Sequence, residues 1–293
     1  MLKSLRHVTV AAAAVLMCVL VAPGATAAVR QSTGTTPAAI AVPPLQEDPA
    51  PRGANDWSCK PSAAHPRPVI LVHGFGAPAA GHFSLYSPYL KAQGYCVFTG
   101  TYGTLKDVPL VNLLGGFQSI EYSAAQLDAF VNKVLAATGK QEVDLVGHSE
   151  GGVMPRYYIK NLGGAAKVHS FVSWAAPNHG LTISGLYTLG QKLIPGLDEK
   201  ILPLWPVTSQ LTNGTGFLDR LNAGDETPGD VRYTALASKT DELVTPYTTS
   251  FLTGDNVENI TLQDQSPKSW GEHMSLAFDP AVWKITDKAL QRN

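Results

Sequence analysis

The segment that most restricts the fold is a short apolar run ending in a glycine-flanked serine. Residues 143–146 predict a strand, and they lead directly into a Gly-x-Ser-x-Gly motif at 147–151, followed by a plausible helix over 153–162. In such a strand–turn–helix unit the serine occupies a sharp, strained turn, and side chains at the flanking glycines would collide with backbone. The helix points its positive end at the serine. The segment therefore predicts a nucleophilic Ser149, rather than a solvated serine in a glycine-rich turn.

Strands and helices alternate around this unit. Short apolar runs predict further strands at 68–72, 95–99, 169–175, 231–237 and 259–262. Amphipathic stretches predict helices over 82–93, between Ser119 and Gly139, and over 281–291. This alternation predicts an α/β fold with a mainly parallel central sheet and helices on both faces.

The N-terminal residues predict an exported protein. Lys3 and Arg6 form a basic start, residues 8–21 are apolar, and a small-residue cleavage site follows at 23–27. This is the layout of a secretory signal peptide, which we place at 1–28, and the apolar run is short for a membrane-spanning helix. The next residues, 29–56, are rich in Ala, Pro, Thr and Gly and predict a flexible leader. One catalytic domain is expected over 57–293.

Within that domain, residues 180–229 interrupt the alternation and predict a helical insertion. An insertion between two strands can form a lid or a pocket wall, or it can simply pack on the core. Leu202, Leu204 and Trp205 are separated by Pro203 and bounded by Pro206. The prolines disfavour a regular helix and leave an apolar ridge that could line a substrate pocket. A core position for Trp205 is the alternative.

Two cysteines remain once the signal peptide, which contains Cys18, is removed. In an exported protein Cys59 and Cys96 are expected to form one disulfide, with two free thiols as the alternative. Closing a loop of about 37 residues stabilises a fold by about 3–4 kcal/mol in the chain-entropy model.

A serine nucleophile needs a base, which in this type of fold follows the acid in the chain. Three histidines come after Ser149. His169 begins a predicted strand, and His179 comes too early to leave room for an acid before it. His273 follows the last predicted strand and is therefore the expected base.

The acid is expected in the loop after strand 231–237, where Asp241 would fix the tautomer of the base and stabilise its charged form. Its neighbour Glu242 is an alternative, and Asp264 at the end of the last strand is a weaker one.

The oxyanion that forms during acyl transfer needs two backbone N–H donors. The residue after the nucleophile, Glu150, supplies one, and the loop after an early strand supplies the other. Residues 73–76 directly follow strand 68–72, so we assign the second donor to Phe75. We expect His73 to be packed and hydrogen-bonded rather than to bind a ligand.

Composition argues against other classes of function. The formal net charge is −1 and no basic run is present, which argues against a nucleic-acid partner. Charged residues make up 15% of the chain, a low-charge composition that suits an extracellular protein. The sequence has no His-Glu-x-x-His motif or clustered His/Asp spacing, which disfavours a metal-dependent hydrolase.

Four motifs carry a resemblance to a known family. Residues 73–76, 147–152, 176–180 and 240–247 look like those of the secreted bacterial triacylglycerol lipases of the α/β-hydrolase superfamily, and the resemblance covers about 57–285. It implies the α/β-hydrolase fold and hydrolysis of carboxylic esters with medium or long acyl chains. No cofactor and no metal are implied.

The chain departs from that family in one respect. Such lipases often carry a further cysteine pair, and here residues 204–205 and 265–266 hold none, so the insertion is expected to be less tethered. The expected partners are a lipid or other ester substrate and an oil–water interface, with the protein as a monomer. A secreted acyltransferase would use the same three residues, and a non-catalytic binding module is the third reading; product analysis with an added acceptor alcohol separates the first two.

Overall fold

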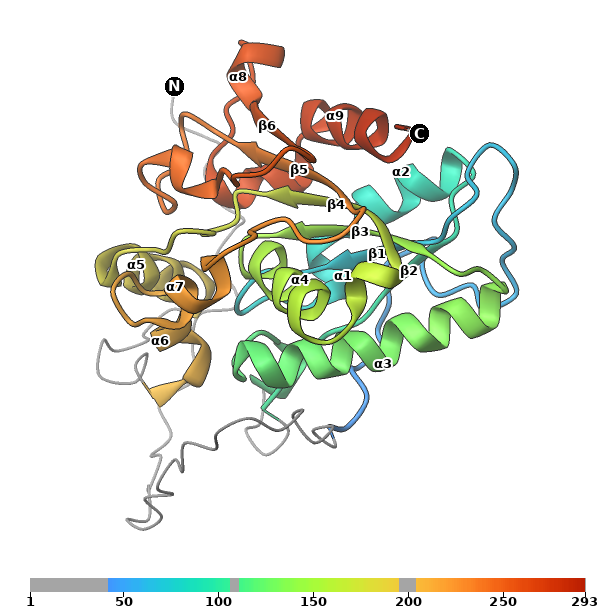
Figure 1. The fold of residues 1–293 in the computed structure, drawn as a ribbon, viewed down its shortest axis with the longest axis horizontal. Helices are drawn as coiled ribbons and strands as arrows, with labels where there is room; N and C mark the ends of the chain where they lie inside the picture. The colour runs from blue at the N-terminus through green and yellow to red at the C-terminus, as the bar shows by residue number, and fades with distance from the viewer. Residues whose placement is uncertain (1–41, 106–110, 195–203, 293) are drawn as a thin grey trace, which may run out of the picture.

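The computed structural model describes residues 42–105, 111–194 and 204–292 (Figure 1). Within them six strands form one sheet in the order β2-β1-β3-β4-β5-β6, and every neighbouring pair is parallel. The strands are β1 (Val69–Val72), β2 (Val97–Thr99), β3 (Val143–His148), β4 (Val168–Trp174), β5 (Arg232–Ala237) and β6 (Val257–Thr261). Each corresponds to a strand predicted from an apolar run, so the predicted parallel α/β architecture is confirmed.

Helices cover both faces of the sheet (Figure 1). On one side lie α3 (Ile120–Thr138) and α4 (Glu150–Asn161), and on the other lie α2 (Tyr86–Ala92) and α9 (Pro280–Leu290). Alternate residues of β1 enter two separate apolar cores: Ile70 packs on the α3 side and Leu71 on the α2 side. In the described part of the chain, no helix combines the length and the apolar character that a membrane span requires.

The ends of α3 are defined by local chemistry. The hydroxyl of Ser119 accepts a hydrogen bond from the Tyr122 N–H, which caps the first turn. Gly139 adopts a left-handed conformation with φ 71° and ends the helix. The helix thus lies between Ser119 and Gly139, as predicted.

The insertion is helical, as predicted. It contains α5 (Ile183–Leu193), α6 (Pro206–Leu211) and α7 (Phe217–Asn222), which lie together at one end of the sheet (Figure 1). Pro206 begins α6 rather than preventing a helix, because the first position of a helix needs no N–H donor. The predicted ridge residue Leu202 lies outside the described residues.

Part of the predicted leader belongs to the folded domain, so the boundary at 57 is too late. Gln46 and Thr101 exchange two backbone hydrogen bonds of 2.8 and 2.6 Å. The Asn55 side chain bonds to both backbone polar atoms of Thr99 over 2.9 Å. Leu45 is buried against Gly100, where an added Cβ would lie 2.0 Å from Leu45 Cδ1. Residues 42–56 thus cover the open edge of the sheet beside β2, which shields its unpaired backbone groups.

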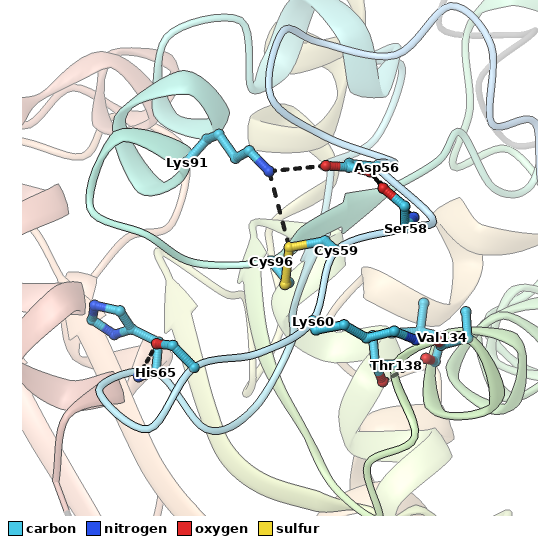
Figure 2. Close-up of a disulfide and its surroundings, with 11 residues drawn as sticks. Asp56, Ser58, Cys59, Lys60, His65, Lys91, Cys96, Val134 and Thr138 are labelled. Atoms are coloured by element: carbon cyan, nitrogen blue, oxygen red, sulfur yellow. Dashed lines mark hydrogen bonds and ion pairs between the residues drawn. A yellow bond between two sulfur atoms is a disulfide. The ribbon is translucent and has the colours of Figure 1, made fainter.

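Cys59 and Cys96 form the predicted disulfide (Figure 2). It joins the segment before β1 to the residue before β2, and the two cysteines have a sequence separation of 37. Lys91 of α2 lies beside it, with Nζ 3.2 Å from Asp56 Oδ2 and 3.9 Å from Cys59 Sγ. Because Cys96 precedes a strand and Ser149 follows one in a parallel sheet, the disulfide lies at the end of the sheet opposite Ser149.

Candidate active site

Ser149 occupies the sharp turn between β3 and α4. Its backbone has φ 56° and ψ −123°, a conformation that an L-residue rarely adopts. An added Cβ at Gly147 would lie 1.8 Å from the Gly151 carbonyl oxygen, and one at Gly151 would lie 2.2 Å from the Val72 oxygen. These close approaches are the physical reason for the two glycines of the motif.

A chain of hydrogen bonds links Ser149 to the predicted base and acid. Ser149 Oγ lies 2.9 Å from His273 Nε2, and His273 Nδ1 lies 2.9 Å from Asp241 Oδ2. The other carboxylate oxygen of Asp241 accepts from the N–H groups of Leu243 and Val244, each over 2.9 Å. Ser149, His273 and Asp241 are all buried. The structure therefore brings together three side chains that are more than 30 residues apart in the chain.

The alternative acids do not face the imidazole ring. Glu242 Oε2 accepts instead from the backbone N–H of His273 over 3.0 Å, and its other oxygen pairs with Lys192. Asp264 pairs with Lys239 at the surface, where its side chain is 60% exposed.

The other two histidines after Ser149 also bind elsewhere. His169 Nδ1 lies 3.4 Å from Asp144, and His179 Nε2 lies 3.2 Å from Glu226. Of the three, His273 is the one that the structure places at Ser149.

The loop predicted to supply the second oxyanion donor lies against the serine. An added Cβ at Gly74 would be 3.1 Å from Ser149 Cβ, and Gly76 donates from its N–H to the Gly115 oxygen over 2.8 Å. Phe75 lies between these two glycines and is buried. Glu150 is the first residue of α4, where a backbone N–H has no partner inside the helix. The 73–76 loop and the first residue of α4 thus both lie next to Ser149.

His73 fixes the base of this loop and is hydrogen-bonded as expected. Its Nε2 accepts from the Tyr102 N–H over 3.2 Å, and its Nδ1 donates to the Gly74 oxygen over 2.8 Å. Tyr102 stacks on the ring and donates from its hydroxyl to the His73 oxygen over 2.8 Å. Burial lowers the pKa of His73 to about 4, so the ring is neutral at neutral pH.

The side chain of Glu150 is a second buried titratable group beside the nucleophile. It is 0% exposed, and neither carboxyl oxygen has a hydrogen-bond partner among the described residues. An added Cβ at Gly116 would lie 2.5 Å from Glu150 Oε2, so the carboxyl packs on backbone. Burial raises the pKa of Glu150 well above its usual range, and the nearby Tyr102 hydroxyl offsets only part of this. Burial therefore favours the protonated, uncharged form of this carboxyl.

Three aromatic rings meet beside the 73–76 loop. Trp205 lies with its ring centroid 5.7 Å from Phe75 and 4.6 Å from Phe117, and the two phenylalanines are 5.3 Å apart. Trp205 is half-buried, whereas its neighbour Leu204 is 69% exposed. The insertion thus places one predicted ridge residue beside Phe75.

Sequence reasoning missed two histidines that contact the site. His148 Nε2 lies 3.0 Å from the His273 carbonyl oxygen, and His148 Nδ1 lies 3.0 Å from His82 Nε2. The position of His148 directly before Ser149 was the available signal. His82, 66 residues away in the chain, gave none.

In the described ranges, no group of three or more His, Cys, Asp or Glu residues is arranged to hold a metal ion.

Comparison with known proteins assigns the family. The sequence profile of Lipase (class 2) matches residues 66–285. The chain belongs to this family. The matched range contains all five residues of the candidate site described above: Ser149, Asp241, His273, Phe75 and Glu150.

Two triacylglycerol lipases, from Pseudarthrobacter phenanthrenivorans and Burkholderia plantarii, are similar to part of the chain. Each is 36% identical over 103 residues, which is 32% of this chain and 28% and 25% of the respective relatives. The match thus spans about a quarter of the length of these relatives.

Solved lipase structures share the fold. Lipase B of Aspergillus fumigatus superposes with a TM-score of 0.62 at 19% identity, over 83% of this chain and 56% of that one. The mature form of lipase BlEst2 of Bacillus licheniformis superposes with a TM-score of 0.55 at 15% identity, over 78% and 94%. Both similarities support the α/β-hydrolase fold for this chain.

Proposed function

We propose that the protein hydrolyses carboxylic esters of lipids through an acyl-enzyme on Ser149. One observation carries this proposal: an unbroken hydrogen-bond chain from Asp241 through His273 to Ser149, at a strained turn beside the 73–76 loop. A serine becomes an effective nucleophile when a neighbouring base can take its proton.

The geometry supports a two-stage acyl transfer. His273 Nε2 takes the proton of Ser149 Oγ as that oxygen attacks the ester carbonyl carbon, and then gives the proton to the leaving alcohol. The N–H groups of Glu150 and Phe75 would stabilise the oxyanion. A water molecule, deprotonated by His273, then releases the acid and frees Ser149. Asp241 keeps the proton of the neutral ring on Nδ1.

The aromatic contacts favour esters with an extended acyl chain. Trp205, Phe75 and Phe117 bring apolar surface to the edge of the 73–76 loop. Burying each acyl methylene on such a surface contributes about 0.8 kcal/mol. Medium- and long-chain lipid esters are therefore the proposed substrates, and the names of the two similar triacylglycerol lipases agree with this class.

We also propose that the protein is exported. The basic, apolar and small-residue segments of 1–28 support this, together with the disulfide between Cys59 and Cys96. The mature N-terminus measured by mass spectrometry should fall after residue 27 or 28, and a retained Met1 would contradict the proposal.

The function is tested with Ser149→Ala and a fluorophosphonate probe. The variant should lose hydrolysis of p-nitrophenyl esters and emulsified triglyceride while keeping its melting temperature, and the probe should label Ser149 alone. Ser209→Ala, at an exposed serine in α6, is the matched control. Labelling at another serine would refute the assignment. With an added alcohol, more transferred ester than free acid would favour the acyltransferase alternative.

A further inference from the structure

The two main-chain polar atoms of His273 are both bound by side chains. Its N–H donates to Glu242 Oε2 over 3.0 Å, and its carbonyl oxygen lies 3.0 Å from His148 Nε2. A carbonyl oxygen only accepts, so the hydrogen of the second bond is on Nε2 of His148. Since the backbone of His273 sets where its ring can reach, these bonds bear on the geometry of the base.

The direction of the next hydrogen bond follows from the first. Burial and the nearby rings of His273 and His82 lower the pKa of His148 well below its usual range, so the ring is neutral and its Nδ1 is an acceptor. His82 Nε2, 3.0 Å away, must therefore donate to it. Burial, with smaller effects of His73 and His273, lowers the pKa of His82 to about 3, so this ring is neutral too. The hydrogen bonds run from His82 to His148 to the carbonyl of His273.

His82 and His148 lie between the 73–76 loop and His273. His148 is the last residue of β3, and His82 is the last residue of α1 (Ala79–His82). They are 1% and 5% exposed, and the His148 ring centroid lies 4.9 Å from that of His82 and 4.8 Å from that of His273. An added Cβ at Gly74 would be 3.5 Å from His148 Nδ1. His148 thus packs against the 73–76 loop on one side and against His273 on the other.

We propose that His148, oriented by His82, is a positioning residue that fixes the backbone of His273 so that its ring stays aligned with Ser149 and Asp241. The inference rests on the proposed function. A neutral histidine suits this role because it donates a hydrogen bond without carrying charge. A lysine or arginine at the same place would set a positive charge beside His273 and oppose its protonation during the reaction.

Substitutions at 148 separate this role from simple packing. His148→Leu should lower kcat about 10- to 100-fold with KM changed less than about threefold, because misalignment of a base affects the chemical step more than binding. His148→Gln should recover most of the loss, since its amide can donate to the same carbonyl. His169→Leu, at a largely buried histidine at the other end of the sheet, is the control and should keep the wild-type kcat. A wild-type kcat in folded His148→Leu, or equal losses in the glutamine and leucine variants, would overturn the proposal.

Two further measurements do not depend on the stability of the His148→Leu variant. His82→Leu removes only the donor to His148 and should lower kcat about 3- to 10-fold at unchanged KM.

In the wild-type protein, ¹⁵N chemical shifts should show both His82 and His148 protonated on Nε2, and a proton on Nδ1 of His148 would refute the assignment. Fluorophosphonate should still label Ser149 in the His148 variants, only more slowly. Absence of labelling in the wild type would instead refute the proposed function itself.

Discussion

Replacing Glu150 by Gln tests whether a protonated carboxyl lies beside the nucleophile. The side chain is fully buried and its oxygens have no hydrogen-bond partner among the described residues. Burial raises the folded-state pKa of Glu150 well above its usual range. The contribution of this protonated carboxyl to the unfolding free energy is therefore fully present below about pH 4.5, where Glu150 is protonated in both the folded and the unfolded chain. It is lost as the pH rises toward the folded-state pKa, because the unfolded chain releases its proton first.

The size of the effect follows from proton linkage. Between the unfolded and folded pKa values, the folded protein holds one proton more, so each pH unit removes about 1.4 kcal/mol of unfolding free energy. For a domain of this size that corresponds to roughly 3–5 °C of Tm per pH unit. Glutamine keeps the shape but does not titrate. Its buried amide adds a penalty of about 1–3 kcal/mol that does not change with pH.

The assay is thermal unfolding of wild type and Glu150→Gln at pH 5, 6, 7 and 8. The Tm of the variant minus the Tm of the wild type should increase by roughly 3–5 °C per pH unit and level off once the pH exceeds the folded-state pKa of Glu150. Glu142→Gln, at an exposed glutamate, is the control and should give a flat difference. A flat difference for Glu150→Gln as well would refute a protonated Glu150, whatever its sign at any one pH.

Three further predictions follow from the site and the disulfide. His273→Ala should lower kcat by roughly 10⁶-fold and Asp241→Asn by roughly 10⁴-fold in ester hydrolysis, and a wild-type rate in either would contradict its assigned role. Thiol titration of the unfolded, unreduced exported protein should find no free thiol, and changing Cys59 and Cys96 to Ser should lower Tm by roughly 6–16 °C without changing KM. Trp205→Ala should lower kcat/KM for long-chain esters at least about tenfold more than for acetate esters, since several methylenes lose their contact. An unchanged chain-length profile with a large loss of Tm would make Trp205 a core residue alone.

The parts of the fold that could be predicted from sequence are those governed by local chemistry. The turn at Ser149 needs glycines at 147 and 151 because backbone atoms approach within 2.2 Å of where their Cβ atoms would be. The strands follow from apolar runs that are buried on both faces of a parallel sheet. Asp241 and His273 could be predicted because the acid and the base come after the nucleophile in the chain. Each of them follows a strand of the parallel sheet, so both lie at the same edge of that sheet as Ser149.

The parts that could not be predicted depend on contacts between distant segments. Residues 42–56 have a composition typical of a flexible leader, yet Gln46 pairs with Thr101 across the sheet edge. No local pattern encodes that pairing. The sequence favours an interrupted helix at Pro206, whereas in the structure Pro206 begins α6. A proline is compatible with both positions, and the residues that follow it decide between them.

The neighbours of the candidate triad share a property that the sequence alone does not reveal. Burial shifts each of the following side chains toward its neutral form: His73, His82, His148 and Glu150. In a site shielded from water, a charge on any of them would act strongly on the reacting groups. A positive charge on His148 would oppose protonation of His273, and a negative charge on Glu150 would oppose the oxyanion. Asp241 is the carboxylate that faces the imidazole ring, and in the proposed mechanism the backbone N–H groups of Phe75 and Glu150 would be the dipoles that face the developing negative charge.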